Sequence, residues 1–198
     1  MRKPVVLVLH GPSGVGKDTI INELQQRIGI KRATSTNSRL PRQGERDGID
    51  YHFVTPDEFL DRVERREFAE RALVYGDLKG LEKREIEGPL AHGQDVIVRT
   101  DVQGARHWRR VLPGAITVLI KAEDVETLRD RLHARATDGD EELARRYAEI
   151  EEELADEPNN DYVVVNRHGG QEAAIAELIS IIERERENPA RPLPKLAI

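Results

Sequence analysis

The start of the chain joins an apolar run to a glycine-rich turn and then to a helical pattern. Val5 to Leu9 are all valine or leucine, which is typical of a strand buried on both faces of a parallel sheet. A helix is predicted over 17–28. Between them stands the motif Gly11-Pro12-Ser13-Gly14-Val15-Gly16-Lys17-Asp18-Thr19. The glycines let backbone N–H groups surround phosphate oxygens, and the lysine adds a full positive charge, so this context predicts a nucleoside triphosphate site.

Three later apolar runs share the character of the first, and each precedes a helical pattern. The runs cover 95–98, 115–120 and 162–165, and the helices are predicted over 104–111, 124–136, 141–156 and 171–186. Strands that alternate with helices predict an α/β fold, in which helices flank a parallel sheet.

Residues 34–92 interrupt this alternation and are predicted to form an inserted α+β subdomain. A helix is predicted over 56–65, because Thr55 and Glu58 suit a capping box, and a strand over 68–75. The chain is then a single domain with a core of 1–33 and 93–186. The tail 187–198, which contains three prolines, is predicted to pack loosely.

Composition excludes several kinds of site and partner. Lys and Arg number 31 against 37 Asp and Glu, for a net charge of −6, so a general nucleic-acid-binding surface is excluded. A chain with 0 cysteines has no disulfide framework, zinc–thiolate site or cysteine nucleophile. The apolar runs are far shorter than the ~18 residues of a membrane span, and the start MRKPVV lacks the apolar core of a signal peptide. We therefore expect a cytoplasmic protein without nucleic-acid or membrane partners, of open oligomeric state.

Asp18 departs from the usual motif, in which a serine or threonine after the lysine serves a magnesium ion. A carboxylate beside a triphosphate repels it unless Mg²⁺ lies between them. Two alternatives remain open: Asp18 is a ligand of the metal or of its water, or it is a first-turn helix residue turned outward.

The insert carries groups that suit a phosphate monoester. Arg39, Arg42 and Tyr51 supply two guanidinium groups and a phenol. At this point the sequence resembles the guanylate kinases. The resemblance rests on segments 35–45, 51–54, 57–59, 68–70 and 101–105, in that order, and extends to about residue 186.

The resemblance implies a P-loop kinase that transfers the γ-phosphoryl group of ATP to GMP, and to dGMP, with Mg²⁺. By that resemblance the GMP phosphate is held by Arg39, Arg42 and Tyr51. The base is read by Ser35, Glu70 and Asp101. Guanine presents N1–H and amino donors and an O6 acceptor, so two carboxylates and a hydroxyl complement it, whereas adenine has an acceptor at N1.

A segment later in the chain, 134–146, resembles the family's mobile lid, with arginines on both of its arms. Arg131 and Arg135 are four residues apart on one predicted helix, where like charges repel unless an anion pairs with both. Arg146 lies on the return helix. We expect these arginines and Lys17 to form the catalytic apparatus, because phosphoryl transfer depends on positioning and charge stabilisation.

Several positions differ from the family pattern. The family usually has Tyr-Tyr-Gly-(Ser/Thr) where this chain has Leu78-Lys79-Gly80-Leu81, so a phenol and a hydroxyl are lost. Lys79 still supplies a point charge for the GMP phosphate. Arg99 stands where the first acid of an Asp-x-Asp motif is usual. Because Asp18 and Arg99 both face the predicted triphosphate, we hypothesise that Asp18 restores the lost negative charge and helps to retain Mg²⁺.

Two other functions stay open. A kinase of the same fold that acts on ribose 1,5-bisphosphate resembles this chain at Gly11 to Asp18, although a sugar phosphate has no use for the base-reading residues. A non-catalytic guanylate-kinase-like binding module is the second, although such modules typically lose the ATP turn. The acidic run from Glu149 to Glu153, with Asp156 and Glu157, is predicted to lie on a solvated helix face, and Trp108 is predicted to pack in the core.

Overall fold

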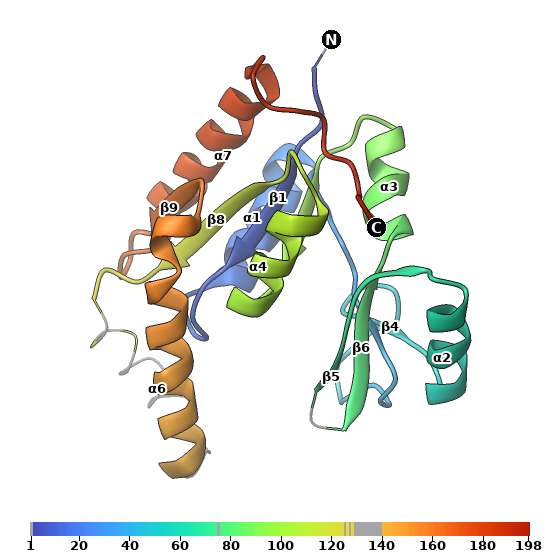
Figure 1. Cartoon of the computed structure of the whole chain (residues 1–198). Helices are drawn as coiled ribbons and strands as arrows, with labels where there is room; N and C mark the ends of the chain where they lie inside the picture. The colour runs from blue at the N-terminus through green and yellow to red at the C-terminus, as the bar shows by residue number, and fades with distance from the viewer. Residues whose placement is uncertain (1, 75, 125, 127, 129–139) are drawn as a thin grey trace.

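The computed structural model describes residues 2–74, 76–124, 126, 128 and 140–198. Its core is a parallel sheet with the strand order β2-β7-β1-β8-β9, covered by helices on both faces (Figure 1). The strands are β1 (Val6–His10), β2 (Lys31–Arg32), β7 (Val96–Arg99), β8 (Ile116–Lys121) and β9 (Tyr162–Val165). The helices are α1 (Lys17–Ile28), α3 (Arg84–Ala91), α4 (Val102–Val111), α6 (Asp140–Ala155) and α7 (Gln171–Glu187), with a short 3₁₀ helix η1 (Glu157–Asn159). The predicted α/β fold is therefore confirmed.

The central strand β1 is buried on both faces, as its sequence predicts. Leu7 and Leu9 enter an apolar cluster with side chains of α1 and α7. Val6 and Val8 enter a second cluster with side chains of α3 and α4. Because successive side chains of a strand point to opposite faces, a wholly apolar strand suits a sheet that is covered on both sides.

A smaller sheet with the order β4-β3-β6-β5 lies beside the core and falls entirely within 34–92 (Figure 1). Its elements are β3 (Thr36–Asn37), β4 (His52–Phe53), α2 (Pro56–Glu64), β5 (Phe68–Val74) and β6 (Asp77–Glu82). Helix α2 begins where predicted, because Thr55 and Glu58 form a reciprocal capping box. The sequence pattern does not predict β6 or α3, because β6 has Gly80 among mixed polar and apolar residues and α3 contains Pro89.

The carboxyl ends of three neighbouring parallel strands meet at one edge of the core sheet. There β2 ends at Arg32, β7 at Arg99 and β1 at His10. The second sheet faces this edge (Figure 1). Ligands of open α/β sheets bind outside the carboxyl ends of the strands, so the fold places the site between the two sheets.

The C-terminal tail is bound to the core, and the predicted loose packing is wrong. The Arg191 guanidinium is buried and donates to the carbonyl oxygens of Glu185, Gly114 and Pro4 at 3.0, 3.1 and 3.1 Å. Leu196 packs against the apolar cluster under α4. A buried guanidinium whose donors all meet carbonyl oxygens fixes this segment, and proline content alone does not indicate it.

Two predicted features fall outside the described residues. The helix over 124–136 lies largely in the gaps, and the lid over 134–146 is represented by the α6 backbone from Asp140 onward. Among the residues described, none of the helices has the length and apolar content that a bilayer crossing requires.

Candidate active site

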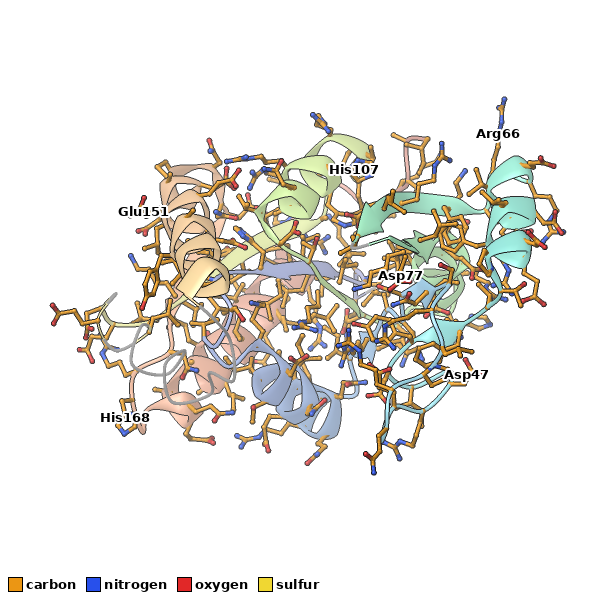
Figure 2. The ribbon with its side chains drawn as sticks, turned by 90° about the horizontal axis from the view of Figure 1, so that it is seen from below. Asp47, Arg66, Asp77, His107, Glu151 and His168 are labelled. Atoms are coloured by element: carbon orange, nitrogen blue, oxygen red, sulfur yellow. The ribbon has the colours of Figure 1, made fainter. Side chains whose placement is uncertain are left out.

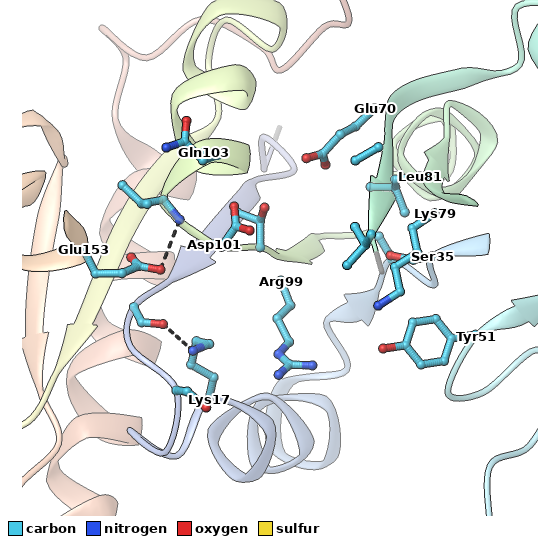
Figure 3. Close-up of a pocket in the computed structure, with 18 of the residues that line it drawn as sticks. Lys17, Ser35, Tyr51, Glu70, Lys79, Leu81, Arg99, Asp101, Gln103 and Glu153 are labelled. Carbon is cyan, nitrogen blue, oxygen red and sulfur yellow. Dashed lines mark hydrogen bonds between the residues drawn. The ribbon is translucent and has the colours of Figure 1, made fainter. Parts of the chain in front are cut away.

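A cavity of about 620 Å³ lies between the two sheets, at the carboxyl edge of the core (Figure 3). Its wall brings together most of the residues predicted for the two substrates. From the glycine-rich turn these are Gly11, Pro12, Ser13 and Lys17, and from the acceptor set Ser35, Tyr51, Glu70, Lys79 and Asp101. In Figure 3 Lys17 and Arg99 lie on the core side of the cavity, opposite Ser35, Lys79 and Tyr51.

The glycine-rich turn is held close to the ends of β8 and β9. Gly11 has φ 137°, and a Cβ there would lie 2.1 Å from the carbonyl oxygen of Ile120. Gly16 has φ 95°, and its Cβ would lie 2.7 Å from Asn166 Nδ2, which donates to Val15 O at 2.8 Å. Only glycine adopts these positive φ angles readily and leaves out the Cβ for which there is no space. The backbone of the turn can therefore approach a phosphate closely.

Lys17 is buried within this turn. Its ammonium group donates to the carbonyl oxygens of Gly11 and, at 2.9 Å, of Pro12 (Figure 3). Burial, and secondly the nearby Arg99, lower the pKa of Lys17 from 10.5 to about 8. An ammonium whose charge is so poorly compensated gains most from an incoming phosphate.

Asp18 faces two arginines from the ends of neighbouring strands. Its carboxylate oxygens lie 3.2 Å from Arg99 Nη2 and 3.8 Å from Arg32 Nη2. In the described part of the chain, no group of three or more histidine, aspartate or glutamate side chains is arranged to hold a metal ion. In this structure the Asp18 carboxylate therefore pairs with two guanidinium groups, and both alternatives for its role toward a metal stay predictions.

The two predicted base-reading carboxylates extend into the cavity from different sheets (Figure 3). Asp101 caps α4, since its Oδ1 accepts a hydrogen bond from Gly104 N at 2.8 Å. Glu70 on β5 accepts a hydrogen bond from Trp108 Nε1 at 2.9 Å. Burial raises the pKa of Glu70, against the opposing effects of His107 and Trp108. Sequence reasoning assigns Trp108 to packing and misses this contact.

The predicted phosphate-binding residues divide between the cavity wall and its surroundings. Tyr51 and Lys79 line the wall, and Lys79 Nζ lies 5.7 Å from the centre of the Tyr51 ring. Arg39 lies 5.4 Å from the centre of that ring but forms a bidentate pair with Glu45, both contacts being 2.6 Å. This pair raises the pKa of Arg39 and lowers that of Glu45 to about 2. Arg42 is exposed, and its backbone N–H donates to Glu45 at 2.7 Å.

Glu153 and His10 form a buried contact that the sequence does not predict. His10 Nδ1 donates to Glu153 Oε2 at 2.7 Å, and Glu153 Oε1 accepts from Val102 N at 3.1 Å. The second ring nitrogen of His10 lies 2.6 Å from Asn160 Oδ1. The prediction of a solvated face is therefore wrong for Glu153, which is 4% exposed. It is wrong as well for Asp156, which is 1% exposed and pairs with Arg106 and Arg109. The spacing of three residues between Glu153 and the buried Ile150 is the signal that could have revealed the burial of Glu153.

Figure 2 shows the chain from below with its side chains, including those along the boundary between the core and the insert. His107 lies on the part of α4 nearest to the second sheet, and its Nε2 lies 3.0 Å from Ala69 O. Helix α4 therefore contacts the insert directly beside the carboxylates predicted to read the base.

The side chains of the three predicted lid arginines lie outside what the structure describes. Arg131 and Arg135 lie outside the described residues, and of Arg146 the structure describes only the backbone within α6. Their catalytic role stays a prediction.

Comparisons with known proteins agree on one family. The family model described as guanylate kinase matches residues 1–185. Guanylate kinase 2, chloroplastic/mitochondrial, of Oryza sativa subsp. japonica is 45% identical over 186 residues, which cover 93% of this chain and 65% of that protein. The guanylate kinase of Symbiobacterium thermophilum is 40% identical over 190 residues, which cover 96% of this chain and 89% of that one. A crystal structure of guanylate kinase from Anaplasma phagocytophilum matches with a TM-score of 0.76 at 27% identity, covering 96% of this chain and 90% of that one.

Proposed function

The chain belongs to the guanylate kinase family, and from this we propose that it transfers the γ-phosphoryl group of ATP to GMP, and to dGMP. Mg²⁺ enters as part of the substrate, bound to the triphosphate. The products are nucleoside diphosphates, so the reaction belongs to purine nucleotide metabolism, for which we propose a cytoplasmic location. One observation carries the proposal: Lys17, Glu70 and Asp101 line a single cavity.

The donor triphosphate binds at the glycine-rich turn. Its oxygens accept hydrogen bonds from the backbone N–H groups at the start of α1, where the helix dipole is positive. Lys17 exchanges its carbonyl partners, Gly11 and Pro12, for phosphate oxygens. This exchange is favourable because a phosphate offers full negative charge to an ammonium group that now has only neutral acceptors.

The acceptor base binds between Glu70 and Asp101. Both carboxylates accept hydrogen bonds from the N1–H and amino groups of guanine, and the Ser35 hydroxyl completes the set. Adenine leaves at least one of the two carboxylates, which the bound base covers, without a donor and places its N1 acceptor against it. An unsatisfied buried polar group costs about 1–3 kcal/mol, which corresponds to roughly a 5- to 150-fold preference for guanine.

The GMP phosphate binds beside Tyr51 and Lys79. Arg39 and Arg42 join it when the phosphate replaces Glu45 as the anion that they face; the bidentate pair of Arg39 with Glu45 has the fork geometry that a phosphate also satisfies. Movement of the insert and the lid toward the core then excludes water, which would otherwise hydrolyse ATP. The lid arginines Arg131, Arg135 and Arg146 stabilise the charge on the transferring group.

A coupled assay with the purified chain tests this function. MgATP is supplied with GMP, dGMP, AMP or ribose 1,5-bisphosphate, and the labelled product is identified. We expect label in GDP and dGDP, much less in ADP formed from AMP, and none on the sugar phosphate. Transfer to ribose 1,5-bisphosphate alone would establish the alternative kinase, to which Asp18 after Lys17 points.

Two variants separate the donor and acceptor ends. Lys17→Met should abolish transfer to every acceptor. Glu70→Gln should raise the KM for GMP and leave the KM for MgATP unchanged. Calorimetric titration with a non-hydrolysable ATP analogue tests the other alternative, a non-catalytic binding module. Such a module has lost its donor site and gives no heat of binding, whereas we expect this chain to bind the analogue.

A further inference from the structure

We propose that Trp108 is a positioning residue for guanine recognition, whose indole N–H holds one oxygen of Glu70 so that the other oxygen faces the base. This inference rests on the proposed function, since it concerns how the acceptor site reads its base. Trp108 lies on α4 and Glu70 on β5, so this hydrogen bond links the core to the insert at the acceptor site, beside the contact of His107 with Ala69 O.

The geometry fixes the roles of the two oxygens of Glu70. Oε2 accepts the indole N–H at 2.9 Å. Oε1 lies over the first turn of α4, where a Cβ on Gly104 would approach it to 2.9 Å. Among the described residues no hydrogen bond to Oε1 occurs, while the Glu70 side chain lines the cavity. Oε1 is therefore the oxygen presented to a ligand, and the absence of a side chain at Gly104 leaves the space for it.

The indole can do this because it is itself immobile. Trp108 is 0% exposed and packs in the apolar cluster with Leu112, Ile86 and Leu81. Its only polar atom is a donor, and Glu70 is its partner. A phenylalanine would fill much of the same space but would donate nothing, so the hydrogen bond has a role that packing does not explain.

The surroundings of Glu70 require such a donor. Leu81 stands directly opposite Glu70 on β6 and offers no polar atom. Burial raises the pKa of Glu70 and Asp101 raises it slightly further, while His107 and Trp108 lower it. Guanine binding needs the ionised carboxylate, because only that form accepts hydrogen bonds from both N1–H and the amino group at full strength.

Trp108→Phe tests the proposal. We expect the KM for GMP to rise roughly tenfold, because a hydrogen bond to a charged group is lost, with kcat and the KM for MgATP changed less than about twofold. In the pH profile of kcat/KM for GMP, the acidic limb should move to higher pH, because the Glu70 carboxylate loses one of the groups that favour its ionised form.

Two further variants distinguish positioning from packing. Leu112→Ala removes a buried side chain from the same cluster and should lower thermal stability without moving the KM for GMP or the acidic limb. In a Glu70→Gln background, Trp108→Phe should have little further effect on the KM for GMP, because the carboxylate that it orients is already absent. Trp108 is the single tryptophan of the chain, so its fluorescence also reports GMP binding without ATP in every variant that retains it.

The outcomes separate this inference from the proposed function. A folded Trp108→Phe with an unchanged KM for GMP and an unchanged acidic limb overturns the inference, and so does a Leu112→Ala that reproduces both changes. In either case the wild-type chain still phosphorylates GMP. A wild-type chain that transfers nothing to GMP overturns the proposed function, and the inference with it.

Discussion

Asp18 and Arg99 form an ion pair, with 3.2 Å between Oδ2 and Nη2, across the boundary between α1 and the end of β7. Each is unusual at its position in the family pattern. The pairing bears on the hypothesis that Asp18 compensates for the charge change at Arg99. The Asp18 carboxylate on α1 balances the Arg99 guanidinium on β7 and keeps it beside the glycine-rich turn. Arg99 also borders the cavity and depresses the pKa of Lys17, so its position affects the donor site.

We predict that Asp18→Ser lowers kcat/KM for MgATP and that adding Arg99→Asp restores part of the loss. The two side chains are 56% and 37% exposed, and pairs at such exposure couple by about 0.2–1 kcal/mol, which is at most about fivefold. A double-mutant cycle in kcat/KM measures the coupling, and the half-saturating Mg²⁺ concentration is recorded for each variant.

The metal-ligand alternative has a different signature in the same experiment. If Asp18 binds Mg²⁺, Asp18→Ser raises the half-saturating Mg²⁺ concentration whether or not Arg99 is present. If turnover and magnesium dependence are both unchanged in Asp18→Ser, neither role of Asp18 is correct.

Lys17 gives a pH prediction. Its pKa of about 8 in the folded chain lies below the ordinary value of 10.5, so affinity for an ATP analogue should fall as pH rises above about 8. The unfolded chain keeps this proton up to higher pH, so Lys17 opposes folding below about pH 8, and the penalty is relieved as pH rises from 8 to 10.5. Calorimetric titration across this range measures the affinity.

Arg99→Met is the matched variant for the titration. It removes the second-largest cause of the low pKa of Lys17, so the fall in affinity should begin at higher pH than in the wild type. A fall that begins at the same pH would show that Arg99 has no electrostatic effect on Lys17.

The sequence predicts the elements whose pattern is local. Val5 to Leu9 predict a strand buried on both sides, and Thr55 with Glu58 predicts the start of α2, because periodicity and capping depend on neighbours in the chain. The contact between Glu70 and Trp108 joins residues 38 positions apart, and that between His10 and Glu153 joins residues 143 apart. Such polar contacts depend on how helices and sheets pack, which no local pattern records. Arg39 is predicted as a phosphate ligand, while its pairing with Glu45 six residues later is missed, because the loop that joins them has no periodic pattern.

The bound tail predicts a stability effect at Arg191. Arg191→Ala leaves the carbonyl oxygens of Glu185, Gly114 and Pro4 without this partner, so we expect a loss of about 2–4 kcal/mol and a fall in Tm of roughly 5–15 °C. Lys195→Ala, which alters an exposed side chain of the same tail, should change Tm by less than about 2 °C. Equal Tm values for the two variants would mean that the tail is as loose as its composition suggests.

Glu153 links three parts of the site and should therefore affect both substrates. Its two oxygens accept from His10, which precedes the glycine-rich turn, and from Val102, which follows Asp101, one of the predicted base-reading residues. Glutamine has one acceptor oxygen, so Glu153→Gln satisfies only one of these donors and turns an amide N–H₂ toward the other. We expect a loss of about 1–3 kcal/mol in stability, with increases in the KM for both MgATP and GMP.

Glu151→Gln provides the control for Glu153, because Glu151 is exposed on the same helix (Figure 2). It should leave Tm and both KM values unchanged. Arg191→Ala provides the second comparison, since it should lower Tm without changing either KM below the unfolding transition. If Glu153→Gln lowers Tm but leaves both KM values unchanged, as Arg191→Ala should, then Glu153 only stabilises the fold. If both KM values rise together, α6 holds the glycine-rich turn and the predicted base-reading residues in one arrangement.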